Sequence, residues 1–176
     1  MKIPRHPKLR GEWAEVHFLA RASEHGLGVA KPYGDCRPYD FIVESNGRMF
    51  RVQVKSTSNK SPDSDGYKCQ VRPPRRPRDR FEVLEFLAVY VIPEDVWYII
   101  PYSEFADKRA INLNPRSQRS PYRQYRDAWD LLVAESPSDV RRRRKREQSV
   151  KARRNGAKRQ KRSTGAWVEL AHAASD

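Results

Sequence analysis

The clearest pattern in the chain is an alternation of apolar and polar residues on both sides of a short turn. Residues 40–44 (DFIVE) and 48–57 (RMFRVQVKST) flank Asn46-Gly47, a dipeptide that favours two-residue β-hairpin turns. A nearly continuous apolar stretch follows at residues 81–92 (FEVLEFLAVYVI), which is typical of a central strand covered on both faces. These segments predict the middle of a β-sheet.

Shorter segments predict the edges of this sheet. Residues 28–33 (GVAKPY) are typical of a short edge strand, and residues 96–100 (VWYII) form a further strand. This strand ends at Pro101, because proline lacks the N–H that strand pairing requires. Residues 58–80 are polar, basic and rich in proline, which predicts a long loop. We expect at most one short strand within it, at residues 67–71.

Helices are predicted on either side of the strands. Residues 11–25 consist of good helix formers and are followed by Gly26, a common residue after a helix C-terminus. In residues 122–133, helical spacing places three large side chains on one face, where we expect them to pack against the sheet: Tyr125, Trp129 and Leu132. The order helix, strands, helix predicts an α/β fold with a mixed β-sheet flanked by helices.

Charge is distributed very unevenly along the 176 residues. The formal net charge is +14, and residues 141–162 contribute +12 of it through thirteen Arg or Lys and the single acid Glu147. The end of the chain has almost no large apolar side chain before Trp167, so it cannot bury a core. We therefore predict a folded domain at residues 1–136 and a basic, disordered tail at residues 137–176. Such a tail favours a polyanionic partner, nucleic acid first and an anionic membrane second.

Other classes of protein are excluded by what the chain lacks. Two cysteines, Cys36 and Cys69, are too few for a disulfide framework or a four-cysteine zinc site. The first residues, MKIPRHPKLRGEW, carry charge with no apolar stretch behind them, unlike a signal peptide. No segment approaches the ~20 apolar residues of a membrane span. We expect a soluble, cytoplasmic protein that does not act in a membrane.

The hairpin brings polar side chains together at the end away from its turn. With the turn at Asn46, Asp40 lies opposite Val52 or Gln53 on the partner strand. Because side chains alternate between faces, Asp40, Gln53 and Lys55 share one face, and the neighbouring valines take the other. This pattern is compatible with a catalytic cluster and also with the plain polar surface of an edge hairpin.

The first helix adds a carboxylate to the same cluster. On a helical wheel, Glu15 falls among apolar side chains and opposite a set that we assign to the solvent face: His17, Arg21 and Glu24. Carboxylates rarely occupy a core-facing side unless they are paired with a cation or bind a metal. Glu12 is a weaker candidate for the same role. The alternative is that Glu15 lies at the helix edge and reaches solvent.

Together these residues supply what a hard divalent cation needs. Mg²⁺ prefers oxygen ligands in octahedral geometry and commonly takes one or two carboxylates. Glu15 and Asp40 would be the carboxylates, and Gln53 and the carbonyl of Val54 would add neutral oxygens. Lys55 would position the attacking water or stabilise developing negative charge. The set predicts phosphodiester hydrolysis at a Mg²⁺ site, with Mn²⁺ as an alternative ion.

These residues and their order resemble the PD-(D/E)XK nuclease superfamily. The resemblance rests on Glu15, on Asp40 in PYDFIV, and on Gln53 and Lys55 in VQVKST, and it extends over residues 8–133. It is nearest to the small single-domain members close to archaeal Holliday-junction resolvases and intron-encoded homing endonucleases. It implies a restriction-endonuclease-like fold in which Asp40 and Gln53 bind metal, Glu15 adds a ligand and Lys55 assists the water.

The sequence departs from the family pattern at the second acidic position. Gln53 stands where Asp or Glu is usual, a variant that also occurs in the superfamily. In addition, Tyr39 separates Pro38 from Asp40, so the Pro-Asp step is interrupted. The ligand set thus carries two formal negative charges, those of Glu15 and Asp40, instead of three.

Two basic segments are candidates for contact with DNA. The first is the proline-rich loop with Arg72, Arg75 and Arg76, since arginine pairs well with phosphate; a solvated linker is the equal alternative. The second is the tail, which would add sequence-independent affinity, with a merely solubilising tail as the alternative. Its candidate residues are Arg141, Arg142, Arg143, Arg144, Lys145 and Arg146. For Glu85, near the start of the central strand, an ordinary strand-end role is favoured over a role at the metal.

We therefore interpret the chain as a metal-dependent DNA endonuclease, homing-endonuclease-like or junction-resolving. The main alternative is a non-catalytic nucleic-acid-binding module that keeps a degenerate nuclease fold. A second alternative is an RNA-binding or ribosome-associated basic protein. Cutting both strands of a duplex with one small active site per chain favours a symmetric homo-oligomer, a dimer or a tetramer.

Overall fold

The computed structural model describes residues 3–34, 37–61, 65–71, 83–135 and 141–142. The chain divides into two compact units, Met1–Ala134 and Glu135–Asp176. All the strands described below belong to the first unit. In the described residues, no helix is long and apolar enough to cross a membrane.

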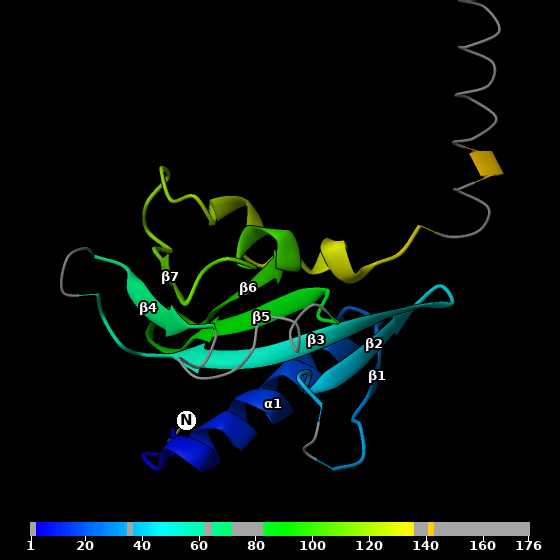
Figure 1. Cartoon of the computed structure of the whole chain (residues 1–176), viewed down its shortest axis with the longest axis horizontal. Coiled ribbons are helices and arrows are strands. Elements are labelled where there is room, and N and C mark those ends of the chain that lie inside the picture. The colour runs from blue at the N-terminus through cyan, green and yellow to red at the C-terminus, as the bar shows by residue number, and fades with distance from the viewer. Residues whose placement is uncertain (1–2, 35–36, 62–64, 72–82, 136–140, 143–176) are drawn as a thin grey trace, which may run out of the picture. The chain divides into compact units, whose positions relative to one another are not determined.

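A five-stranded mixed sheet forms the centre of the first unit (Figure 1). In spatial order its strands are β1 (Gly28–Ala30), β2 (Phe41–Ser45), β3 (Arg48–Thr57), β5 (Phe86–Val91) and β6 (Val96–Pro101). Among these neighbours β3 and β5 are parallel, and the other pairs are antiparallel. The prediction of a mixed sheet with a short edge strand and a buried central strand is confirmed.

The β2–β3 hairpin closes through a two-residue turn. Asn46 and Gly47 both have positive φ, 51° and 78°, which is the combination of a type I′ turn. From this turn the register runs without interruption to the pair of Phe41 and Val52. Asp40 therefore lies one step beyond the paired part of the hairpin.

The helix α1 (Pro7–Glu24) covers one face of the sheet (Figure 1). Its buried residues are Ala14, Phe18 and Ala22. They pack into a core with apolar side chains of β2, β3, β5 and β6. After the helix, Gly26 has a left-handed φ of 71°, and the N–H of Leu27 returns to the carbonyl of Ala22 (3.1 Å), as in a Schellman motif. The predicted role of Gly26 at the end of the helix is confirmed.

A second layer of structure covers the opposite face of the sheet. The strands β4 (Tyr67–Gln70) and β7 (Ala110–Leu113) form a separate two-stranded antiparallel sheet. Their buried side chains join those of β5 and β6 in a second core. Short 3₁₀ turns lie in the connections, η2 (Ile92–Glu94) and η3 (Tyr102–Glu104). The sequence pattern predicts β4 and gives no indication of β7.

Residues 122–133 do not form the α-helix that their spacing predicts. They make two 3₁₀ turns, η4 (Arg123–Tyr125) and η5 (Trp129–Leu132), which are separated by Asp127 at a positive φ of 49°. The N–H of Asp127 donates to the carbonyl of Trp97 (2.7 Å), and its Oδ1 accepts from the N–H of Trp97 (3.0 Å). These tertiary hydrogen bonds to β6 prevail over the helical pattern.

The three large side chains of this segment consequently separate. Trp129 and Leu132 pack into the core on the α1 side, and Tyr125 packs into the core formed with β4 and β7. All three are buried. The prediction that they pack against the sheet is confirmed, whereas the prediction that they share one helical face is wrong.

Candidate active site

The site lies where β3 extends beyond β2. Asp40 precedes β2 and is held against β3 by two hydrogen bonds. Its N–H donates to the carbonyl of Val52 (2.9 Å), and its Oδ2 accepts from the N–H of Val54 (2.7 Å). The carboxylate therefore occupies the edge of β3 at the point where pairing with β2 stops, next to Gln53 in the register of the hairpin.

Gln53 and Lys55 project from the face of β3 opposite α1. Val52 and Val54 are buried in the core on the α1 side, and side chains alternate along a strand, so Gln53 and Lys55 point to the other face. Both are half-buried. Asp40, Gln53 and Lys55 thus have the common face that the alternation in the sequence predicts.

The amide oxygen of Gln53 is a buried acceptor without a donor. In the described residues, Gln53 Oε1 accepts no hydrogen bond although it is inaccessible to solvent. Leaving a buried polar atom unpaired costs about 1–3 kcal/mol, so such an atom in a folded chain needs an explanation. A bound cation is one, because a hard cation takes neutral oxygen ligands beside carboxylates.

Glu15 approaches the same place from α1. Its side chain is 22% exposed, and its Oε2 lies 2.7 Å from the ammonium of Lys31, which follows β1. Glu15 is also close enough to Asp40 for its charge to raise the pKa of that carboxyl. Glu12, the weaker candidate, is exposed. Glu15 is therefore the carboxylate of α1 that approaches Asp40 at the strand edge, whereas Gln53 and Lys55 project from the other face of β3.

Lys31 is a member of this cluster that the sequence pattern does not reveal. The hydrogen bond to Glu15 is the main reason that the pKa of Lys31 is raised, and the charges of Glu15, Asp40 and Glu12 add to the effect. The pairing of β1 with β2 brings Lys31 to the site. A sequence argument could have found it only by first placing β1 beside β2.

Burial raises the pKa of Asp40 above its usual value, and the charge of Glu15 raises it further. The hydrogen bond from Val54 and the cations Lys55 and Lys31 act in the opposite direction. An ionised Asp40 is therefore costly in this environment unless a positive charge lies nearby. A metal cation at the site would lower this pKa and keep the carboxylate ionised.

The oxygen atoms gathered here suit a hard divalent cation. They are two carboxylates, the amide oxygen of Gln53 and the carbonyl of Val54, which lies on the same strand edge as the Val54 N–H that binds Asp40. Within the described ranges, no group of three or more His, Cys, Asp or Glu is placed to hold a metal. A metal at this site would thus need the neutral oxygens as well as the carboxylates of Glu15 and Asp40.

His17 does not lie on the solvent face to which the helical wheel assigns it. Its ring packs against Tyr90, with 4.7 Å between centroids, and against Trp97, and its Nδ1 is buried. The large rings that β5 and β6 present to α1 widen the covered side of the helix. The assignment holds for Arg21 and Glu24, which form an ion pair at the surface.

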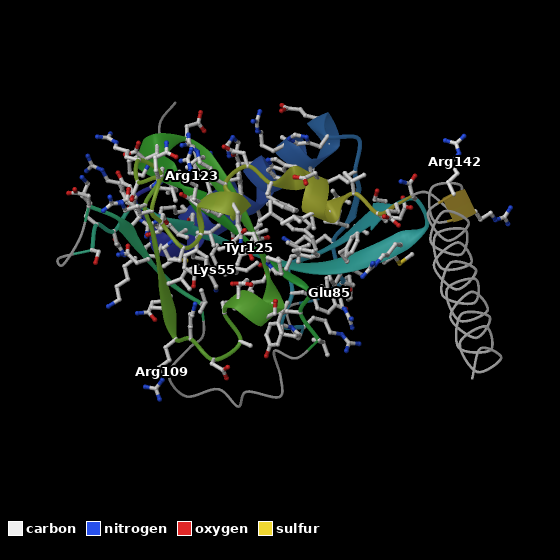
Figure 2. All side chains as sticks on the ribbon, turned by 90° about the horizontal axis from the view of Figure 1, so that it is seen from above. Lys55, Glu85, Arg109, Arg123, Tyr125 and Arg142 are labelled. Carbon is white, nitrogen blue, oxygen red and sulfur yellow. The ribbon has the colours of Figure 1, made fainter. Side chains whose placement is uncertain are left out.

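Glu85 has a structural role away from the cluster. It forms an ion pair with Arg51 (3.3 Å) and accepts a hydrogen bond from the Arg51 N–H (3.1 Å), just before β5 begins. Arg48 lies 4.0 Å from its other oxygen. Lys55 and Glu85 occupy separate places along the sheet (Figure 2). These contacts agree with the favoured prediction of an ordinary strand-end role.

Most of the predicted DNA-contacting residues lie outside the described residues. These are Arg72, Arg75, Arg76, Arg143, Arg144, Lys145 and Arg146. Arg141 and Arg142 are described and exposed. Contact of these residues with DNA stays a prediction, as does the disorder expected of the tail.

Two comparisons with known proteins agree with each other. A family model described as PD-(D/E)XK endonuclease matches residues 5–132. Among solved structures, the bacterial homing endonuclease I-Ssp6803I is 30% identical, with a TM-score of 0.60; the match covers 72% of this chain and 92% of that chain. No match is found among curated proteins. The range matched by the family model contains α1 and the strands, and with them Glu15, Asp40, Gln53 and Lys55.

Proposed function

Because the chain belongs to the PD-(D/E)XK endonuclease family, we propose that it is a metal-dependent endonuclease that hydrolyses phosphodiester bonds of DNA. Four residues form the proposed active site: Glu15, Asp40, Gln53 and Lys55. The observation that supports the site most is the buried Gln53 Oε1, which has no hydrogen-bond donor among the described residues; Gln53 is next to the desolvated Asp40 in the hairpin register. A bound cation would give that oxygen a partner.

The oxygen donors have distinct roles in this proposal. Glu15, Asp40, Gln53 and the Val54 carbonyl would hold the cation, which we propose to be Mg²⁺, with Mn²⁺ as a substitute. When bound, such an ion polarises a phosphate oxygen and acidifies a water. Gln53 contributes only through its oxygen, since its NH₂ group is a donor. The Val54 N–H fixes the Asp40 carboxylate, which reduces the entropy that is lost on binding.

Lys55 has a role beyond metal binding. Its charge acts on Asp40, and it shares one face of β3 with Gln53. An ammonium at this place donates hydrogen bonds to a water or to a phosphate oxygen. It would orient the water for attack on phosphorus and stabilise the negative charge that develops on the phosphate. Because the side chain is half-buried, fewer solvent molecules compete for it.

A role like that of homing endonucleases is the finer part of the proposal. The similarity to a bacterial homing endonuclease, which includes nearly all of that protein, supports it. Cleavage of both strands with one such site per chain needs two copies, so we propose a symmetric homo-oligomer, a dimer or a tetramer. The net +12 of residues 141–162 would add sequence-independent affinity for the duplex.

A second candidate function is DNA binding without cleavage. Two observations favour it: Gln53 stands where the family pattern has an acid, and Glu15 already has a cation partner in Lys31. Both reduce the negative charge that is available to a metal. The two functions differ in whether phosphodiester hydrolysis occurs at all.

Nicking of supercoiled plasmid separates the two functions. The parent is incubated with Mg²⁺, Mn²⁺ or EDTA, beside Asp40→Asn and the control Glu44→Gln, an exposed position on β2. We expect the parent and Glu44→Gln to nick in Mg²⁺ or Mn²⁺, and no nicking in EDTA or by Asp40→Asn. Equal cleavage by Asp40→Asn and the parent would contradict the site. DNA binding without cleavage under any condition would favour the second function.

A further inference from the structure

One edge of β3 is left open past the hairpin. The pairing of β2 with β3 ends at Phe41 and Val52, while β3 continues to Thr57. Between this edge and β4 lies a hollow of about 330 Å³, which we call the β3–β4 groove. Its lining includes Lys55, Ser56, Asn59, Lys60, Lys68 and Gln70. The groove therefore begins at the lysine of the proposed active site.

The β3–β4 groove is positively charged. Among the described residues, Lys55, Lys60 and Lys68 line it, and no Asp or Glu does so. Within the described part of the chain, none of these lysines forms an ion pair with a carboxylate. The thiol of Cys69, which also lines the groove, adds no negative charge because burial raises its pKa to about 12. The charges of Lys60 and Lys55 also act on the nearby carboxylates of Glu94 and Asp40, so the lining is positive without being wholly uncompensated.

A neighbouring hollow of about 380 Å³ differs in this respect. Its lining includes Lys60 and Arg116, but also Asp65 and Glu94. Glu94 lies 3.1 Å from Arg116, so cation and carboxylate there neutralise each other. Among the described residues, a lining with lysines and no carboxylate is therefore a property of the β3–β4 groove and not of the hollow beside it, although Lys60 belongs to both.

Hydrogen bonds fix the backbone around the groove. Thr57 Oγ1 donates to the carbonyl of Lys68 (2.7 Å) and accepts from the N–H of Asn59 (3.2 Å). The N–H of Lys68 donates in turn to the carbonyl of Asn59 (2.8 Å). Lys60 lies over the ring of Tyr67, with 5.8 Å from Nζ to the centroid. The backbone positions of the lysines are therefore fixed before a ligand binds, which lowers the entropy cost of binding.

The groove also presents neutral hydrogen-bond donors. Backbone groups alternate along a strand, so the N–H of Ser56 points to the same edge as the N–H of Val54, which binds Asp40. Ser56, Asn59 and Gln70 are also among the lining residues. Cations and neutral donors without carboxylates match a phosphodiester, whose oxygens are acceptors that share a negative charge.

We propose that the β3–β4 groove binds a backbone phosphate of the cleaved DNA strand, adjacent to the phosphate at the active site. Lys60 and Lys68 contact this phosphate, and Lys55 stands between the two phosphates. The inference rests on the proposed nuclease function and states where the strand runs as it leaves the site. Because phosphate contacts carry no base identity, the groove sets the position of the strand and not the sequence preference.

The salt dependence of DNA binding tests the groove. Fluorescence anisotropy with a random-sequence duplex, from about 50 to about 200 mM salt, gives the slope of log K against log salt, which falls by about 0.9 for each lost phosphate contact. Lys60→Met/Lys68→Met keeps the aliphatic parts of both side chains and removes two charges. Because both lysines contact one phosphate, we expect its slope to be smaller by about 0.9 and its affinity at about 100 mM salt to be lower by about tenfold.

Charge-matched and charge-restored variants serve as controls. Lys8→Met/Arg21→Met removes two charges from α1, on the opposite face of the sheet, and should keep the parent slope. Lys60→Arg/Lys68→Arg should restore the slope, with circular dichroism to show that each variant is folded. An unchanged slope in Lys60→Met/Lys68→Met, or an equal decrease in the α1 variant, would overturn the proposal. If the methionine variant does not fold, Lys60→Gln and Lys68→Gln singly should each lower the slope, by up to about 0.9.

Plasmid nicking in Mg²⁺ shows whether a negative result concerns the proposed phosphate-binding groove or the proposed nuclease function. If the parent nicks plasmid and the methionine variant keeps the parent slope, the groove is wrong and the nuclease function stands. If no protein nicks plasmid but the slope falls by about 0.9, the groove holds a DNA phosphate and the nuclease function is wrong.

Discussion

Lys31 and Glu15 form an ion pair of 2.7 Å that joins the residue after β1 to α1. The ammonium of Lys31 also lies 6.0 Å from the ring centroid of Phe41. Glu15, a proposed metal ligand, therefore has a positive partner within the chain, and a cation that binds Glu15 must compete with Lys31. Because the Lys31 side chain is 62% exposed, this ion pair is weak and the competition is modest.

Replacement of Lys31 should therefore strengthen metal binding. We expect Lys31→Met to bind Mn²⁺ about two- to fivefold more tightly than the parent, which corresponds to the strength of an exposed ion pair. Electron paramagnetic resonance of free Mn²⁺ gives the affinity. The control Arg48→Met removes a charge beside the hairpin turn and should bind as the parent does. Weaker binding by Lys31→Met would mean that Lys31 positions Glu15 for the metal instead of competing with it.

Asp40 should oppose folding at neutral pH when no divalent metal is present. Burial raises its pKa in the folded chain above the ordinary 3.8. Its contribution to stability is thus fully present below pH 3.8 and is lost as the pH rises through the folded-state pKa. Asp40→Asn keeps an acceptor for the Val54 N–H and removes the charge. In EDTA at pH 7 it should melt at a higher temperature than the parent, and the difference should shrink as the pH falls toward 3.8.

Thermal melts followed by circular dichroism, with and without Mn²⁺, check this expectation. Added Mn²⁺ should raise the melting temperature of the parent and leave that of Asp40→Asn nearly unchanged, because a ligand stabilises only the protein that binds it. A parent that is more stable than Asp40→Asn in EDTA at pH 7 would contradict the argument from burial.

Gln53 is the proposed metal ligand that substitution can test most directly, because it stands where the family pattern has an acidic residue. Gln53→Ala should abolish cleavage while the chain stays folded, since the side chain points away from the core that holds Val52 and Val54. Gln53→Glu adds a charge and should need less Mg²⁺ for half-maximal nicking than the parent, whatever its maximal rate. A Mg²⁺ titration of all three proteins measures this. If Gln53→Ala cuts as well as the parent at every concentration, Gln53 is not a ligand.

Lys55 should matter far more for cleavage than for DNA binding. A group that positions water or stabilises charge contributes about 10²- to 10⁴-fold to rate. We expect Lys55→Ala to lose cleavage by such a factor, while its affinity for duplex DNA falls by no more than the loss of one phosphate contact. Single-turnover nicking and anisotropy on the same preparation separate the two effects. Equal cleavage rates in Lys55→Ala and the parent would remove Lys55 from the mechanism.

The hairpin and its polar cluster could be predicted because both follow from local rules. Asn46-Gly47 determines the type of turn, the turn determines the register, and the alternation of side chains determines which residues share a face. The position of Asp40 beside Gln53 follows from these three steps. The side of α1 that carries Glu15 could be predicted in the same way from the helical period.

The features that could not be predicted depend on partners far away in the chain. The strand β7 exists through its pairing with β4, and Lys31 reaches Glu15 only because β1 adds to the edge of β2. Asp127 interrupts a helical pattern because its N–H and its side-chain Oδ1 both bond to the backbone of Trp97. Neither amino-acid propensity nor periodicity contains such information, since each describes a short segment alone.

The tight turn of the hairpin fixes the register of its two strands. It thereby determines on which face of the sheet the side chains at the far end of the hairpin lie. Asp40 lies six residues before Asn46, roughly 20 Å along an extended strand. Even so, the turn determines which residue of β3 lies opposite Asp40 and therefore which side chains share its face. One inserted residue there would move every later pair by one step and turn either the valines or the polar cluster to the wrong face. The residues of this exposed turn are therefore constrained by the proposed active site, which lies at the other end of the hairpin. Insertions at the Asn46-Gly47 turn should therefore be poorly tolerated, although exposed loop tips usually accept insertions well.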